Sequence, residues 1–79
     1  MKLVNIGNGS SIQAARVVAV FPLDQSVEDR INQADKKGRL FDMANGRAAK
    51  SIVLTDNDFL FLSSLTAGAI TERLEFAST

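Results

Sequence analysis

The stretch RVVAVFP at positions 16–22 decides the fold of this chain. β-Branched residues pack well on a pleated sheet surface, whereas Pro22 cannot donate to a sheet ladder and ends the run. The stretch therefore predicts a strand over residues 16–21. Its residues do not alternate between apolar and polar, which is typical of a strand that is buried on both faces.

Shorter apolar runs on both sides of this strand predict the rest of a small, mostly antiparallel sheet. These further strands cover residues 3–6, 11–14, 40–44, 51–55 and 59–63. A turn at residues 7–10 joins the first two, and a turn at residues 56–58 precedes the last. Residues 40–44 and 51–55 flank Asn45-Gly46, a dipeptide suited to a tight turn, so we expect them to form a hairpin with a long basic loop.

Two helices are predicted, one long and one short. Ser26, followed by Asp29 three residues later, is a capping-box variant that marks the start of the long helix, and Gly38 ends it. Thr66 caps the short helix. The inward residues of both helices are spaced three or four positions apart: Val27, Ile31 and Ala34 in the first, and Ile70 and Leu74 in the second.

The chain of 79 residues is expected to form a single α+β domain, residues 1–79, with a thin core. Two helices cannot cover both faces of a sheet whose strands are apolar throughout. Burial of apolar surface stabilises a protein by roughly 25 cal/mol per Å², so a sheet face left exposed to water would cost a free energy comparable to the whole stability of a small domain. We therefore expect a homo-oligomer that buries the second face. The alternative is a more compact monomer in which Phe21, Phe59 and Phe61 are core residues.

The charges are unevenly distributed, although nine basic and nine acidic residues give a net charge of zero. Residues 30–50 hold six of the basic residues and two of the acids, so this stretch carries +4 and the rest of the chain carries −4. A protein charged in this way can present a basic patch to a polyanion although its overall field is weak.

Several functional classes are disfavoured by what the sequence lacks. With no cysteine and no histidine, there is no thiolate nucleophile and no imidazole base or metal ligand. We therefore expect no enzymatic activity, no cofactor and no metal. No apolar run approaches the ~20 residues of a membrane span, and the N-terminus does not resemble a signal peptide. The expectation is a cytoplasmic protein without a membrane partner or a small-molecule substrate.

A series of short motifs follows in a distinctive order along the chain. They are Asn5-Ile6-Gly7, Ala15-Arg16, Pro22, Ala34-Asp35 followed by Gly38, Leu40-Phe41-Asp42, Gly46-Arg47 with Lys50, and Asp56-Asn57-Asp58 leading into Leu62-Ser63. Together they resemble the RemA family, the extracellular matrix regulatory proteins, which are small bacterial DNA-binding regulators. The resemblance runs from about Leu3 to Leu74. It implies an α+β subunit that closes into a ring, surface arginines that contact DNA, and activation of biofilm matrix genes.

The resemblance also implies which residues contact DNA. The family's arginine before the apolar strand falls on Arg16, and its arginine-rich loop falls on Arg47 and Lys50. The loop departs from the family because a Gly-Arg-Arg-Thr-Arg type of segment is here GRAAK at positions 46–50. Arginine binds phosphate with a bidentate fork, whereas lysine is a point charge, so we expect weaker binding.

Three further cations are candidates for DNA contact: Lys36, Lys37 and Arg39. For the two lysines, the alternative is a solvated helix end that the helix dipole favours.

Two functional hypotheses remain. The first is a sequence-tolerant DNA-binding transcription regulator of biofilm matrix genes, in which a ring repeats Arg16, Arg47 and Lys50 along one rim and adds up weak phosphate contacts. The second is a structural or interaction homo-oligomer of the same fold, with weak or lost binding to double-stranded DNA.

Overall fold

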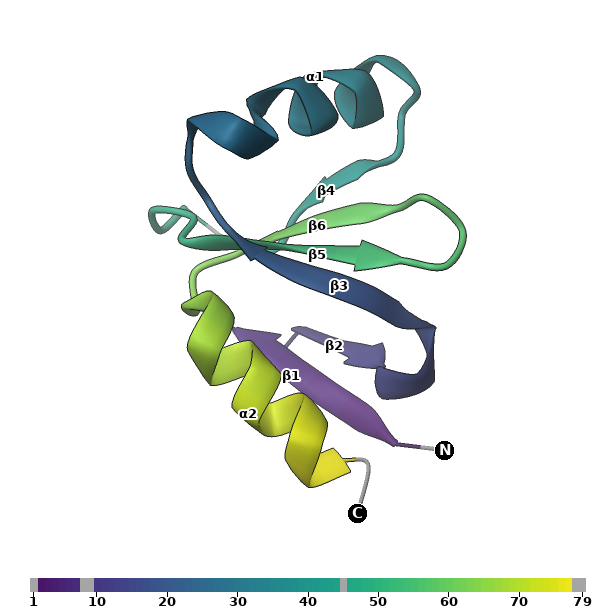
Figure 1. Ribbon diagram of the computed structural model, residues 1–79, viewed down its shortest axis with the longest axis vertical. Coiled ribbons are helices and arrows are strands. Elements are labelled where there is room, and N and C mark those ends of the chain that lie inside the picture. Colours follow the sequence, from purple (N-terminus) through teal and green to yellow (C-terminus); the bar gives the residue numbers. More distant parts are fainter. Residues whose placement is uncertain (1, 8–9, 45, 78–79) are drawn as a thin grey trace.

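The computed structural model describes residues 2–7, 10–44 and 46–77, and its elements are stacked in three layers (Figure 1). Helix α1 (Glu28–Lys36) forms the first layer and a four-stranded sheet the second. The third layer combines helix α2 (Ala67–Ala77) with a separate two-stranded sheet. The predicted α+β class with two helices and mostly antiparallel strands is therefore confirmed.

The strands are β1 (Leu3–Gly7), β2 (Ser10–Gln13), β3 (Val17–Pro22), β4 (Leu40–Asp42), β5 (Ser51–Thr55) and β6 (Leu60–Ser63). β1 and β2 pair antiparallel, as predicted. The larger sheet has the order β3-β5-β6-β4, in which the β3-β5 and β5-β6 pairs are antiparallel and the β4-β6 pair is parallel. Residues 17–22 thus form an edge strand, where a proline such as Pro22 is tolerated. The prediction that this strand begins at Arg16, ends before Pro22 and is buried on both faces is wrong, because β3 includes Pro22 and none of its residues is buried.

The predicted hairpin of residues 40–44 and 51–55 is wrong, because β6 lies between β4 and β5. Residues 43–50 carry the chain past the end of β6 and are held there at both ends. The Met43 N–H donates to the carbonyl of Leu62 at 2.9 Å, and the Lys50 N–H donates to the carbonyl of Ser63 at 2.7 Å. Asn45 in this loop, and Asn8 and Gly9 in the turn predicted at residues 7–10, lie outside the described residues.

The predicted capping box at the start of α1 is also wrong. Ser26 lies inside a short 3-10 turn, η2 (Gln25–Val27), which Asp24 caps by accepting hydrogen bonds from the Ser26 hydroxyl and from the Ser26 N–H at 2.8 Å. These two bonds, with the hydroxyl as the larger cause, lower the pKa of Asp24. α1 begins only after this turn, and Val27 at its N-cap makes no side-chain cap.

The relative lengths of the helices are the reverse of the prediction, since α1 has nine residues and α2 has eleven. The end of α1 is as predicted: Gly38 adopts a φ of +69° just beyond it. The cap of α2 is also confirmed, because the Ala69 N–H donates to the Thr66 hydroxyl at 3.2 Å. Ile70 is fully buried and Leu74 packs against the same core.

Both faces of the larger sheet are covered within one subunit. This corrects the expectation that one face would stay exposed to water in a single subunit. The core against α1 is formed by Val27, Ala34, Ile52 and Leu60. The core on the other face is formed by Val4, Ile6, Val53 and Ile70. The sequence argument counted only helices as cover, whereas β1 and β2 contribute to the second face. The alternative that placed Phe21 and Phe61 in the core is closer to the structure, since each packs against one of these cores.

Gly7 at the end of β1 provides a test of this packing. Its φ is +117°, a backbone conformation that residues with a side chain rarely adopt, and a Cβ there would lie 3.0 Å from the Ser64 Oγ. We expect Gly7→Ala to lower the free energy of unfolding by about 1–3 kcal/mol in urea denaturation. Gly68→Ala is the matched control because, apart from its own stretch of helix, no atom of the described residues lies within 4 Å of a Cβ there. This control is expected to gain up to about 1 kcal/mol, and an equal loss in both variants would contradict the prediction.

Candidate nucleic-acid interface

The six predicted DNA contacts lie at two opposite ends of the larger sheet. We call the end with residues 56–58 the turn end and the end with residues 43–50 the loop end. Arg16 precedes β3 at the turn end, where the Asp56 N–H donates to its carbonyl at 2.9 Å. Lys50 adjoins the last residues of β3, where the Leu23 N–H donates to its carbonyl at 3.1 Å. The length of β3 separates the two ends by about 17 Å, at ~3.4 Å per residue.

A single subunit therefore does not bring Arg16 together with Arg47 and Lys50. The prediction of one common rim depends on how subunits assemble, and it stays a prediction.

Arg16 is held at the protein surface by its neighbours. It is the last residue of the short 3-10 turn η1 (Ala14–Arg16). Its Nη1 lies 3.6 Å from the Oδ1 of Asp56, and its Nε donates to the Oε1 of Gln13 at 3.4 Å. The side chains of Arg16 and Asp56 are 56% and 50% exposed, so water and ions reach the pair. Such an exposed ion pair contributes little to stability, and a phosphate can displace the carboxylate.

Arg39 lies at the same end as Arg16, on the other side of the turn. Its Nη1 donates to the carbonyl of Asn57 at 2.7 Å, and its guanidinium carbon lies 5.7 Å from the ring centroid of Phe59. Lys36 and Lys37 are exposed at the C-terminal end of α1, where a positive charge complements the helix dipole. Four of the six predicted cations thus gather at the turn end, together with the acids Asp56 and Asp58.

Arg47 and Lys50 are both exposed at the loop end. Gly46 has a φ of +85°, and the Arg47 N–H donates to the carbonyl of Ala44 at 3.1 Å, so the backbone turns sharply just before the arginine. Ala44 is buried and anchors the loop to the core. The loop thus presents two cations from a backbone that is fixed on both sides.

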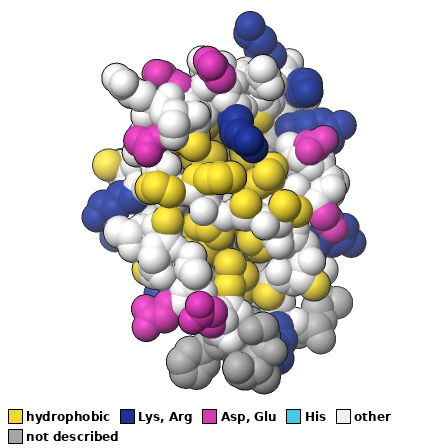
Figure 2. Space-filling model, in the orientation of Figure 1, with side chains coloured by type: hydrophobic (Ala, Val, Ile, Leu, Met, Phe, Trp, Pro, Cys, Tyr) yellow, Lys and Arg dark blue, Asp and Glu magenta, His cyan; other side chains and the backbone are white. Residues whose placement is uncertain are grey.

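The surface carries charges of both signs. On the face shown in Figure 2, an apolar area in the middle is bordered by basic and acidic side chains. The basic residues that are concentrated in residues 30–50 of the sequence lie on α1 and at both ends of the larger sheet in the folded chain.

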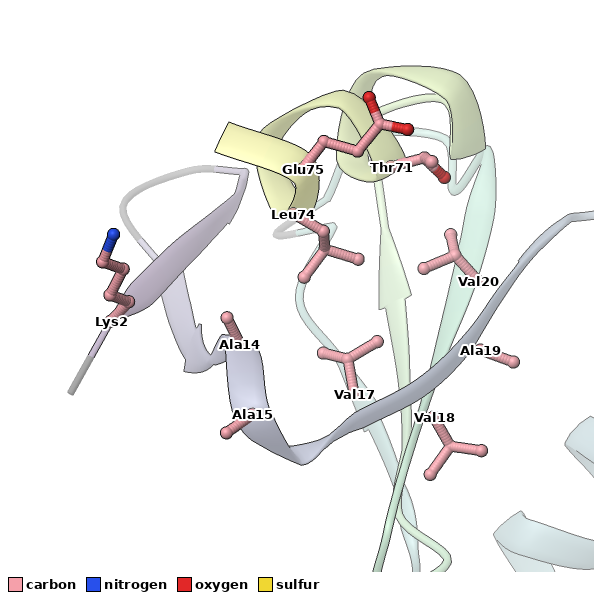
Figure 3. Close-up of a pocket in the computed structure, with 10 residues that line it drawn as sticks. All are labelled: Lys2, Ala14, Ala15, Val17, Val18, Ala19, Val20, Thr71, Leu74 and Glu75. Carbon is pink, nitrogen blue, oxygen red and sulfur yellow. The ribbon is translucent and has the colours of Figure 1, made fainter. Parts of the chain in front are cut away.

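A groove of about 700 Å³ lies between β3 and α2 (Figure 3). Its lining includes Val17, Val18, Val20 and Leu74, and the side chain of Val18 points away from the helix. Because β3 is an edge strand, one side of its backbone has no neighbouring strand among the described residues. Val18 is 62% exposed at this edge. The groove and Val18 make the β3 edge a substantial apolar part of the surface.

Sequence reasoning missed two features of the turn end. One is Asp56 as the partner of Arg16, which lies forty positions away in the chain. The other is the contact of Phe59 with Phe41, whose ring centroids are 5.2 Å apart. Neither contact has a local sequence signal, because each depends on the order of the strands.

The structure is that of a small α+β protein with exposed cations at both ends of its sheet. The chain belongs to the RemA-like family, described as extracellular matrix regulatory protein A-like, whose model matches residues 3–74. The resemblance seen in the sequence is therefore confirmed, and the family is a regulatory one. None of the helices among the described residues is long and apolar enough to cross a membrane.

Relatives from several organisms match nearly the whole chain, and each is provisionally named a regulatory protein. The relative from Geobacillus thermodenitrificans strain NG80-2 is 37% identical over 75 residues, which cover 94% of this chain and 86% of the relative. The relative from Thermodesulfovibrio yellowstonii is 38% identical over 73 residues, covering 91% and 86%. The relative from Desulfotalea psychrophila is 36% identical over 76 residues, covering 95% and 68%.

Proposed function

We propose that this regulatory protein binds double-stranded DNA as a ring-shaped homo-oligomer and controls transcription of biofilm matrix genes. The observation that best supports DNA binding is the placement of Arg16, exposed and backed by Gln13 at the protein surface. Arg39, Arg47 and Lys50 add cations at the two ends of the same sheet, and Lys36 and Lys37 add two more at the turn end.

Contact with the phosphate backbone fits this arrangement better than reading of bases. The two ends of the sheet that carry these cations are separated by about 17 Å, the length of β3, which exceeds the ~12 Å width of the major groove. One subunit can therefore touch phosphates on both sides of a groove. The first turn of α1 carries Glu28 and Asp29, which disfavours insertion of its N-terminus into DNA. Backbone contacts carry no sequence information, so binding would be tolerant of sequence.

Assembly is the second part of the proposal, and we assign the β3 edge to contact with a second copy of the chain. An unpaired strand edge is a template for pairing with another strand. Two β3 strands related by a two-fold axis would present the same apolar residues to each other, which is the self-complementarity that a symmetric dimer needs. The exposed Val18 and the groove beside it would be buried in this contact. Such pairs would then close into the ring through a further contact.

A mobility-shift assay across salt concentrations tests DNA binding. The proposal expects log affinity to fall linearly with log salt, with a slope of about −0.9 for each phosphate contacted. Absence of binding at low salt would favour the alternative, a structural oligomer of the same fold. Two observations favour this alternative. Ala48 and Ala49 replace possible cations in the loop, and acidic side chains lie among the basic ones on the surface.

Asp56 gives a sharper test because it competes with DNA for Arg16. We expect Asp56→Asn to strengthen binding to a duplex by roughly two- to fivefold, the range set by an exposed ion pair of up to about 1 kcal/mol. Fluorescence anisotropy at low salt measures this change. Asp58→Asn is the matched control, since it removes the same charge from the same turn, and no ion pair between Asp58 and Arg16 is found among the described residues. Equal effects in both variants would show that only the overall charge matters.

A further inference from the structure

Three phenylalanine rings form a continuous aromatic surface along β4 and β6. Phe41 and Phe61 are neighbours in the parallel ladder, with ring centroids 5.4 Å apart and planes 23° from parallel. Phe59 meets Phe41 edge-on at 5.2 Å. Phe41 is 37% exposed, and Phe59 and Phe61 are half-buried. The core therefore does not use all of this aromatic surface.

A cleft of about 230 Å³ opens beside Phe59 and Phe61 at the turn end. Its lining combines apolar and polar side chains, namely Ile12, Gln13, Arg16, Thr55, Asn57, Phe59 and Phe61. The amide side chains in this set can donate and accept hydrogen bonds, and Arg16 supplies a positive charge. A flat ligand that is apolar on its faces, polar at its edges and linked to an anion would match this lining.

A second cation stabilises the wall of the cleft. Arg39 donates to the carbonyl of Asn57 at 2.7 Å and lies over the ring of Phe59 at 5.7 Å. The Thr55 hydroxyl lies 2.9 Å from the Asn57 Oδ1. These contacts hold Asn57 in place, so the polar wall is formed before any ligand arrives. Arg16 is available to a ligand, because its exposed pair with Asp56 can be exchanged for a phosphate.

We infer that this cleft binds an unpaired nucleobase, which stacks on Phe59 and Phe61 while Arg16 binds the phosphate of the same nucleotide. Proteins hold single-stranded nucleic acids by stacking their bases on aromatic side chains next to cations. The inference rests on the proposed function and deepens it by naming single-stranded DNA as a ligand. A base inside a duplex cannot enter the cleft, because it is paired and stacked. An apolar peptide fits less well, since it would bury the charge of Arg16 and supply no anion for it.

The experiment compares three probes with the full chain: a short oligo(dT) strand, a duplex of equal length, and thymidine monophosphate. The test variant is Phe59→Leu, which keeps an apolar side chain but removes the aromatic face. Phe21→Leu is the matched control, because Phe21 packs against the opposite core and has its own arginine, Arg30, at 5.4 Å. Circular dichroism confirms that both variants are folded.

Phe59→Leu is expected to weaken oligo(dT) binding roughly five- to tenfold, in line with the loss of one base stack. The same variant should change duplex binding by less than about twofold, and Phe21→Leu should change neither, since neither substitution removes a charge that neutralises phosphate. Binding of thymidine monophosphate as tight as that of oligo(dT), with the same dependence on Phe59, would support the cleft and identify the free nucleotide as its ligand.

Three results would overturn the inference. The first is oligo(dT) binding that Phe59→Leu and Phe21→Leu affect equally. The second is duplex binding without any oligo(dT) binding, which would leave the proposed function intact. The third is the absence of binding to all three probes, which would overturn both. Oligo(dT) binding that depends on Phe59, without duplex binding, would instead support the cleft and contradict the proposed duplex function alone.

Discussion

Val18→Asp is expected to split the proposed homo-oligomer at its β3 seam, which lowers its mass toward that of the 8.5 kDa subunit, and to leave the fold of the subunit intact. Val18 is 62% exposed in the isolated subunit, so a carboxylate there remains hydrated and costs the monomer little. At a seam between two β3 strands, the same carboxylate would be buried without a partner and would face its own copy across the two-fold axis. Burial of an unpaired charge is strongly unfavourable. The dissociation constant should therefore rise by a factor on the order of a hundred or more.

Sedimentation velocity over a range of protein concentrations measures this effect. Leu3→Asp is the matched control, because Leu3 is 63% exposed on β1 and makes no part of the proposed seam. This control should keep the mass of the unmodified protein. If Val18→Asp leaves the mass unchanged, or if Leu3→Asp lowers it equally, the β3 edge is not the contact between copies.

The double substitution Arg16→Ala and Arg47→Ala is expected to abolish DNA binding in a mobility-shift assay. The mass of the proposed oligomer should not change. Each subunit would bind one phosphate fewer at each end of the sheet, and the same loss would recur in every subunit of the proposed ring. The salt slope should become shallower by about 0.9 for every phosphate that is no longer neutralised. The decrease in affinity should exceed about a hundredfold, which mobility shift and anisotropy can both measure.

The single variants test the separation of the two ends. Residues about 17 Å apart with no shared partner should have additive effects, so the two losses in binding free energy should sum to that of the double variant within about 0.5 kcal/mol. Arg30→Ala removes the same charge from α1 and is expected to change binding by less than about twofold. Loss of the oligomer in the double variant would mean instead that these arginines are structural.

The parts of the fold that local chemistry determines could be predicted from the sequence. The β-branched run predicted β3, the apolar run at residues 3–6 predicted β1, and Gly38 predicted the end of α1. The start of α1 was misplaced because Asp24 and Ser26 compete as caps. Asp24 forms the bond within its own turn, and that choice depends on the path of the chain after β3.

Long-range pairing could not be predicted in the same way. The Asn45-Gly46 dipeptide favours a tight turn, but it does not determine that residues 43–50 pass the end of β6 and leave β4 parallel to it. The cover on the second sheet face was missed for a similar reason. A hairpin formed by β1 and β2 can lie in any of several positions, and only packing places it with α2 over Val53.

For the candidate site as well, local features could be predicted from the sequence and long-range contacts could not. The cations themselves could be named from the sequence, because charge and exposure on turns are local properties. Their distribution over two ends could not, since it depends on strand order. The pairing of β3 with β5 puts Asp56 beside Arg16, and the path of β4 beside β6 puts Arg39 against the same turn.

The edge of β3, which has no neighbouring strand in the part of the chain that the structure describes, has a consequence for control inside a cell. If this edge joins copies as proposed, the separate subunits present at low concentration have too few cations to hold DNA. At high concentration, assembly brings the cations of all subunits together in one step. Promoter occupancy would then rise steeply with the copy number of the protein, so modest changes in its synthesis or turnover would act as a switch without any effector.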